Sequence, residues 1–183
     1  KVAFEVLHRI NKVTPIMPSA LVTFSLLDND DKAMTVEEGR RVLKPLLDYI
    51  KRRGLDLSED INLEDYGGLY DVLRTLEREG VIRRYTDGPE DIYWIAENRA
   101  HEAAFYRNTL IHHLITRAIC EVALVRVAQE EAEDVTNAMW EEVVRLRDVL
   151  KYEFFFPRTT HFAADVANEV DIAYPGWESE TFD

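Results

Sequence analysis

The sequence FYRNTLIHH, residues 105–113, lies within the most apolar segment of the chain, which runs from Arg99 to Glu133. This segment contains no Gly or Pro, and it therefore predicts one long helix. One broad stripe of that helix is apolar and contains Ile111, Leu114, Ile115, Ala118, Val122 and Val125. The adjoining side carries Phe105, His112, Ile119 and Ala123. We therefore expect this helix to be covered on most faces and the rest of the fold to pack around it.

Arg107 falls in the middle of the apolar stripe. A guanidinium group does not lose its proton in proteins, so its burial requires a carboxylate, phosphate or carbonyl partner. In a structural interpretation, Arg107 pairs with a buried acidic side chain or with helix-end carbonyls and ties the long helix to the N-terminal helices. In a functional interpretation, it faces an interface with another domain and binds an anionic group there. Both interpretations stay open at this point.

The first 34 residues predict two short helices joined by a proline-rich connection. Residues 2–10 form an amphipathic run that should end near Thr14, because the residue before a proline avoids the helical region. Ser19 is a suitable cap for a second helix at 20–27. The connection between them is either a structural elbow or a substrate contact.

Residues 35–96 predict two helices followed by a β-hairpin, the outline of a winged helix. Thr35 and Glu38 match a capping box that opens a helix ending near Arg53, and residues 63–79 predict a second helix. The strands are expected at 81–85 and 92–95, on either side of a Gly-Pro turn. Residues 58–96 carry 10 acidic and 4 basic side chains, which would repel the phosphates of a nucleic acid. We therefore interpret this segment as a packing module.

The C-terminal part predicts further helices around the long one. A helix is expected at 136–154, and it leads into three consecutive phenylalanines, Phe154, Phe155 and Phe156. Three successive rings cannot all face one core, so one of them should pack on another domain or on a membrane surface. We therefore expect a mainly α fold with three segments, 1–34, 35–96 and 97–183, packed as one compact unit.

The composition describes a folded protein with an acidic surface. The apolar content of 46% excludes general disorder, and 183 residues are enough to bury a core. The net charge is −13, but residues 1–57 carry 10 basic and 8 acidic side chains, whereas residues 58–183 carry 12 and 27. Only the N-terminal third is therefore suited to an anionic surface.

Several classes of site are not supported by the sequence. The single cysteine, Cys120, allows no disulfide framework and fits a reducing cytoplasm. No signal peptide is visible, and charged residues interrupt the longest apolar stretch, so we expect no membrane span. His112 and His113 point about 100° apart on a helix and cannot bind one metal ion together. We expect no metal and no cofactor.

Three blocks of the sequence carry a family resemblance: VAFEVLHRINKVTPIMPSALVTFSLL at 2–27, AAFYRNTLIHHLITRAICEVAL at 103–124 and RDVLKYEFFFP at 147–157. In this order they resemble the C-terminal half of bacterial membrane-bound glycerol-3-phosphate acyltransferases, and only residues 51–89 match loosely. That family performs its chemistry with a His-x-x-x-x-Asp motif upstream of these blocks. Here the fifth residue after each histidine is Val13, Tyr106, Arg117, Ala118 or Val166, so the catalytic half is missing.

The resemblance implies a function for a larger protein. The whole enzyme would transfer a fatty acyl group from an acyl-coenzyme A or acyl-carrier-protein thioester to the 1-hydroxyl of glycerol 3-phosphate. Its His would act as general base and its Asp would orient that His. This chain would be the non-catalytic C-terminal portion. Its partners would be the N-terminal acyltransferase domain and, without spanning it, the cytoplasmic face of the inner membrane.

The candidates for substrate binding or for the domain interface are Arg107, Tyr106, Asn108 and His112. In the functional interpretation, Arg107 helps to hold the phosphate of glycerol 3-phosphate or a carboxylate that lines its pocket. Two other functions stay open. One is a helical scaffold or interaction module without an enzymatic domain, and the third is a winged-helix nucleic-acid binder, although we expect no nucleic-acid partner.

Overall fold

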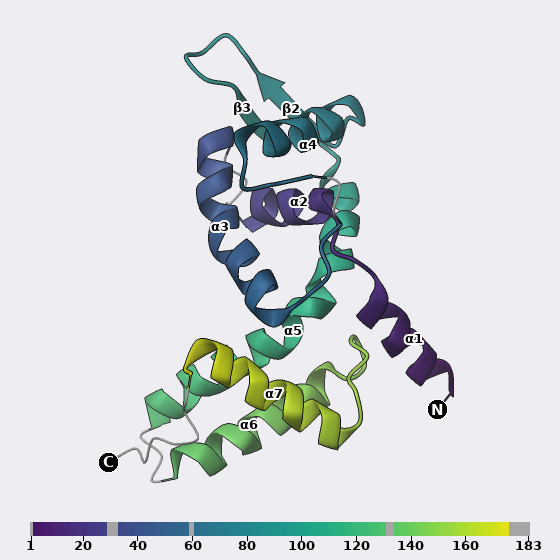
Figure 1. Ribbon diagram of the computed structural model, residues 1–183, viewed down its shortest axis with the longest axis vertical. Helices are drawn as coiled ribbons and strands as arrows, with labels where there is room; N and C mark the ends of the chain where they lie inside the picture. The colour runs from purple at the N-terminus through teal and green to yellow at the C-terminus, as the bar shows by residue number, and fades with distance from the viewer. Residues whose placement is uncertain (1, 29–32, 59–60, 131–133, 176–183) are drawn as a thin grey trace. The chain divides into compact units, whose positions relative to one another are not determined.

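The computed structural model describes residues 2–28, 33–58, 61–130 and 134–175, and these residues are mainly helical (Figure 1). In order, they form α1 (Val2–Val13), α2 (Pro18–Asp28), β1 (Met34–Thr35), α3 (Val36–Arg53), α4 (Tyr66–Arg78), β2 (Ile82–Tyr85), β3 (Ile92–Ile95), α5 (Ala100–Glu130), α6 (Val135–Leu150) and α7 (Thr159–Ala173). The predicted mainly α fold class is confirmed, and α5 is the predicted long helix. The tail at 176–183, which we grouped with the last segment, lies outside the described residues.

The internal contacts divide the chain into two compact units. The central unit is Thr14–Ile111, and the terminal unit combines Lys1–Val13 with His112–Asp183. Helix α5 contributes to both units, because the boundary falls between Ile111 and His112. The division that we expected, 1–34, 35–96 and 97–183, stays a prediction.

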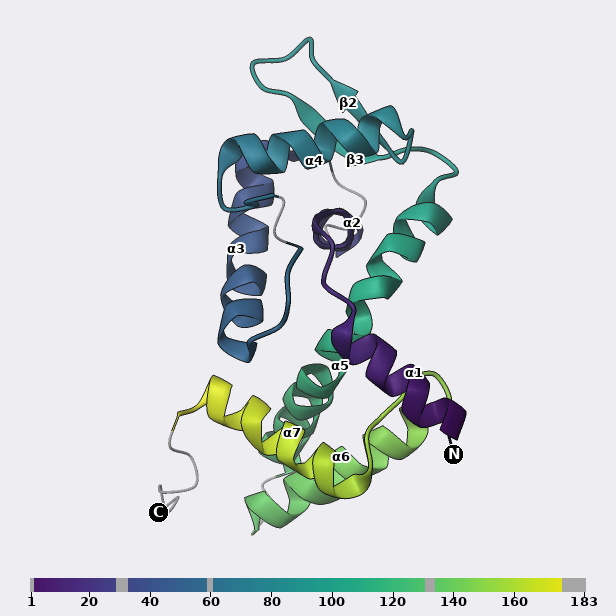
Figure 2. The same cartoon turned by 45° about the vertical axis from the view of Figure 1, so that its right-hand side comes forward.

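Helix α2 forms the centre of the central unit. Figure 2 looks nearly along its axis, and α2 lies between α3 and the first turns of α5, with α4 across it. Its buried residues cover most of its length: Pro18, Ala20, Leu21, Val22, Thr23, Ser25 and Leu26. The hydroxyls of Thr23 and Ser25 donate to the carbonyls of Ser19 and Leu21, at 2.8 and 3.0 Å. Such bonds to the preceding turn allow polar side chains to be buried without unpaired groups.

The caps of α3 are those that the sequence predicts. The amide of Glu38 donates to Oγ1 of Thr35 at 3.2 Å, and the amide of Thr35 donates to Oε2 of Glu38 at 2.8 Å. Gly54 ends the helix with a φ of +66°, a left-handed conformation that favours glycine. The boundaries predicted for this helix are therefore confirmed.

The predicted hairpin is confirmed and has one strand more than we expected. Strands β2 and β3 pair antiparallel, with Ile82 opposite Ile95 and Tyr85 opposite Ile92. Strand β1 pairs with the other edge of β3, so the strand order is β1-β3-β2. We missed β1 because two residues are too few for an alternating pattern to be visible. The order α2, β1, α3, α4, β2 and β3 keeps the winged-helix outline.

A partly buried polar cluster holds α4 against the hairpin. Arg84 of β2 forms ion pairs with Glu77 of α4 at 3.3 Å and with Asp91 at 3.1 Å. Asp91 also accepts a hydrogen bond of 3.4 Å from the hydroxyl of Tyr93, which is fully buried. Burial raises the pKa of Tyr93 to about 12, so its hydroxyl stays protonated and donates. Since these three charged groups have partners within the cluster, we assign the cluster a structural role.

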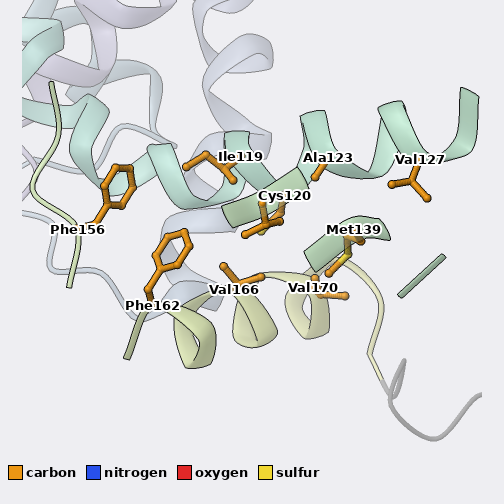
Figure 3. Close-up of a cluster of buried hydrophobic side chains, with 10 residues drawn as sticks. Ile119, Cys120, Ala123, Val127, Met139, Phe156, Phe162, Val166 and Val170 are labelled. Carbon is orange, nitrogen blue, oxygen red and sulfur yellow. The ribbon is translucent and has the colours of Figure 1, made fainter. Parts of the chain in front are cut away.

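The core of the terminal unit lies between α5, α6 and α7 (Figure 3). Its buried side chains are Ile119, Cys120, Ala123, Val127, Met139, Val143, Phe156, Phe162, Val166 and Val170. The guanidinium carbon of Arg147 on α6 lies 5.1 Å from the ring centroid of Phe162. Nη2 of Arg147 donates to the carbonyl oxygen of Pro157 at 3.3 Å. Arg147 therefore holds the loop between α6 and α7 against this core.

The three consecutive phenylalanines diverge. Phe156 is buried and meets Phe162 edge to face, with ring centroids 5.4 Å apart, while Phe154 is half-buried beside this core. Phe155 is 43% exposed. The prediction that three rings cannot all face one core is confirmed. The partner that we expect for the outward ring, another domain or a membrane surface, stays a prediction.

In the described part of the chain, no helix is both long enough and apolar enough to cross a bilayer.

Candidate functional site

Tyr106 anchors α5 within the central unit. It is half-buried, and its hydroxyl donates to Oε2 of Glu79 at 3.1 Å. Burial and then the Glu79 carboxylate raise the pKa of Tyr106, so the hydroxyl is a donor at neutral pH. Arg99 reaches the same end of α4 and donates to the carbonyl of Glu79 at 3.5 Å. This contact is structural, and a substrate-binding role for Tyr106 stays a prediction.

Arg107 is not buried as we expected. Its side chain is partly exposed, and its Nε and Nη2 atoms both donate to Oδ1 of Asn108, at 3.3 and 3.0 Å. Within the residues that the structure describes, Arg107 forms no ion pair with a carboxylate. The prediction of a buried Arg107 is therefore wrong, because no other part of this chain fully covers the stripe at this position. An amide oxygen carries no net charge, so the guanidinium keeps its full positive charge.

The side of α5 that faces the core also differs from our prediction. The buried residues of α5 are Ala103, Leu110, Ile119, Cys120, Ala123 and Val127. Val122 and Val125, which we predicted to be in the core, are 52% and 58% exposed, and Phe105 is 68% exposed. The expectation that α5 is covered on most faces is therefore wrong for this chain. Apolar residues lie on both sides of α5, so the pattern does not say which side meets α6 and α7.

His112 connects α5 to α1 within the terminal unit. Its Nε2 lies 3.2 Å from the carbonyl oxygen of Asn11, and its ring centroid lies 3.9 Å from that of His113. A carbonyl only accepts, so Nε2 of His112 carries a proton. Burial lowers the pKa of His112, so its imidazole is neutral at neutral pH. His112 thus behaves as an interior histidine, and its role at a substrate site or domain interface stays a prediction.

Glu142 is a charged residue that the sequence analysis missed. Its side chain on α6 is 8% exposed, and it pairs with Arg145 of the same helix and with Arg126 of α5, the latter at 3.6 Å. The hydrogen bond from Arg145 holds the pKa of Glu142 below its usual range. A signal was present in the sequence, because Glu142 lies three residues from both Met139 and Arg145 on the apolar side of the predicted helix.

A hollow of about 490 Å³ lies on α5 in the terminal unit. Its described lining residues are Glu121, Val122, Val125, Arg126 and Gln129. They include no histidine that could act as a general base beside a carboxylate. Across the described ranges, moreover, no group of three or more His, Cys, Asp or Glu side chains could hold a metal ion.

Comparison with known families identifies the kind of protein to which these elements belong. The family model of the glycerol-3-phosphate acyltransferase C-terminal region matches residues 1–174. The chain belongs to this family. The resemblance inferred from the three sequence blocks is thereby confirmed, and the match covers both units of this acyltransferase C-terminal region.

Relatives of this acyltransferase C-terminal region include plsB1 proteins, which are named as acyltransferases. Those of Mycobacterium bovis and of two strains of Mycobacterium tuberculosis are 35% identical to it over 172 residues. The aligned part is 93% of this chain and 28% of each relative, so the chain spans about 28% of the length of these relatives. These comparisons favour neither the scaffold nor the nucleic-acid alternative.

Proposed function

We propose that this chain is the non-catalytic C-terminal region of a glycerol-3-phosphate 1-O-acyltransferase. The family match over residues 1–174 is the observation that carries the proposal. The complete enzyme transfers a fatty acyl group from acyl-coenzyme A or acyl-carrier protein to glycerol 3-phosphate in phospholipid biosynthesis. The relatives that are named as acyltransferases support the same class of reaction.

The acyl-transfer step is assigned to the part of the enzyme outside this chain. The step needs a base that takes the proton of the attacking hydroxyl and a group that orients this base. In this chain no histidine is followed by Asp at the fifth position, and His112 already bonds to the carbonyl of Asn11. We therefore expect the chain alone to be inactive.

Arg107 is the residue of this chain that we assign to the phosphate of glycerol 3-phosphate. It is partly exposed, and its full charge faces no carboxylate among the described residues. A planar guanidinium can bind two phosphate oxygens at once. Asn108 holds Nε and Nη2 of Arg107, so it acts as the positioning residue. This assignment follows the functional interpretation of Arg107, because Arg107 forms no buried ion pair among the described residues.

Helix α1 is the part of the chain that we expect at the membrane surface. Val6, Ile10 and Val13 share one side of the helix and are 48, 50 and 72% exposed. Arg9 is exposed beside this side but pairs with Glu5 of the same helix at 3.0 Å, so the exposed apolar side chains carry this assignment. This arrangement supports peripheral attachment at the cytoplasmic face of the inner membrane. Val13→Glu in the complete protein should reduce co-sedimentation with phosphatidylglycerol vesicles, and an unchanged bound fraction would contradict this role of α1.

Enzyme assays on the purified product of the complete gene test the proposed reaction. With acyl-coenzyme A and glycerol 3-phosphate, we expect release of free coenzyme A, followed with a thiol-reactive dye, and formation of 1-acylglycerol 3-phosphate. Glycerol is the matched control, because it offers the same hydroxyl without the phosphate. Equal rates with glycerol, or no product from glycerol 3-phosphate with either acyl donor, would contradict the proposal.

A further inference from the structure

In the terminal unit, α5 has a second apolar side that does not face the core. The core side is formed by Ile119, Cys120, Ala123 and Val127, each at most 4% exposed. Ala118, Val122 and Val125 lie on the roughly opposite side of the helix, and all three are exposed. We call these three residues the outer stripe. A helix that is apolar on both sides is typical of a segment that is covered on both sides in the complete protein.

The outer stripe borders the hollow described above, and ion pairs hold the rim of that hollow. Arg126 pairs with Glu142 of α6 at 3.6 Å, and Glu121 pairs with Arg117 at 2.7 Å. Val122 and Val125 supply the apolar part of the lining. An apolar centre with a polar rim is the usual arrangement of a protein interface. The hollow is therefore suited to an apolar side chain of a protein partner.

Charge argues against two other occupants of this surface. Residues 112–183 carry 15 acidic and 6 basic side chains, so an anionic lipid surface would repel this part of the chain. A second copy would bring the same excess of negative charge and would be repelled as well. Docking of a partner on the same polypeptide has the same electrostatic and desolvation costs. The covalent link, however, gives this partner a high effective concentration.

The relatives indicate where such a partner is found. This chain spans 28% of their length, so most of each relative lies outside the region that it matches. We propose that the outer stripe is the docking surface for the catalytic part of the same polypeptide, with an apolar side chain of that part in the hollow. The inference rests on the proposed function, because it requires that an acyltransferase domain belongs to the same chain.

Cysteine labelling of the complete protein tests this docking surface. Val125→Cys and Val149→Cys form a matched pair, because the two valines are 58% and 62% exposed and only Val125 belongs to the outer stripe. The native Cys120 is buried, and burial raises its pKa to about 12, so its thiol does not compete for a maleimide. Mass spectrometry of the peptide that carries each position reports the labelling rate. We expect the cysteine at 125 to react at least about tenfold more slowly than that at 149.

Equal labelling rates at the two positions, fast or slow, would overturn the docking surface. Protection at 125 that requires added phosphatidylglycerol vesicles, or that rises with protein concentration, would overturn it too, because lipid or a second copy would then be the occupant. Acyl transfer measured on the same preparations separates the two proposals. An active enzyme with equal labelling rates removes the docking surface and keeps the proposed function. Slow labelling at 125 in a protein without acyl transfer removes the proposed function and, with it, the catalytic part as the occupant of the outer stripe.

Discussion

The guanidinium of Arg107 and the side-chain amide oxygen of Asn108 form a two-point contact on one turn of α5, with donor distances of 3.3 and 3.0 Å. This contact orients the guanidinium group and does not neutralise its positive charge. The arrangement differs from a structural ion pair, in which both charges are satisfied within the fold. It leaves the positive charge available for the phosphate that we propose as the ligand of Arg107.

Arg107→Leu should leave the free energy of unfolding of this chain unchanged within about 0.5 kcal/mol, because a partly exposed charge without a carboxylate partner contributes little. In the complete enzyme, the same substitution should raise the KM for glycerol 3-phosphate at least about tenfold, as expected for the loss of one charge-assisted contact. The KM for the acyl donor should not change, and Arg107→Lys should have a smaller effect. Urea unfolding and initial rates measure these quantities. A destabilisation of about 3 to 5 kcal/mol would instead indicate a broken buried pair.

Phe162→Ala should destabilise the chain by about 3 to 5 kcal/mol, because it removes a ring from the closed core of the terminal unit. Phe162 is 2% exposed and packs on Phe156 below the guanidinium of Arg147. The matched control is Phe105→Ala, since Phe105 is 68% exposed and should change stability by no more than about 0.5 kcal/mol. Urea midpoints for the two variants measure the difference. Similar losses of stability in the two variants would contradict the packing of Phe162 in the core between α5, α6 and α7.

Glu142 should make the stability of the chain depend on pH. Its pKa in the folded chain lies below the ordinary value of 4.5, so below that pH the unfolded chain binds more protons than the folded one. Its contribution to stability is therefore full above the ordinary value and is lost as the pH falls through the lowered one. Near about pH 6, Glu142→Gln should have a lower free energy of unfolding than the parent chain. This difference in the free energy of unfolding should become smaller toward about pH 3.

Urea midpoints measured across this range test the Glu142 prediction. Glu141→Gln is the control, because Glu141 is exposed on the same helix and accepts a hydrogen bond from the neutral side-chain amide of Asn137. A difference in stability between the parent chain and Glu142→Gln that does not change with pH would contradict a lowered pKa of Glu142 in the folded chain.

The local features of the fold were predictable because each depends on neighbouring residues. The capping box of Thr35 and Glu38, the terminator Gly54 and the long segment without Gly or Pro lie within a few turns of the elements that they define. The family resemblance was visible for the same reason, since its blocks are continuous stretches of sequence.

The orientation of α5 and the contacts of the candidate site were not predictable in this way. The partner of Tyr106 is Glu79, 27 residues away, and the partner of His112 is Asn11, 101 residues away. A stripe of apolar residues says that a helix side can be buried, but not that this chain itself buries it. For Arg107, the apolar stripe therefore predicted a burial that the structure does not show.

The most direct test of the central claim compares acyl transfer by the complete protein and by the 183-residue chain alone. Radiolabelled glycerol 3-phosphate is incubated with palmitoyl-coenzyme A or palmitoyl-acyl-carrier protein, and the label extracted into chloroform is counted. The account predicts that the complete protein transfers label into lipid with at least one donor and that the chain alone stays at the enzyme-free background. Turnover by the chain alone, or no turnover by the complete protein with either donor, would contradict it.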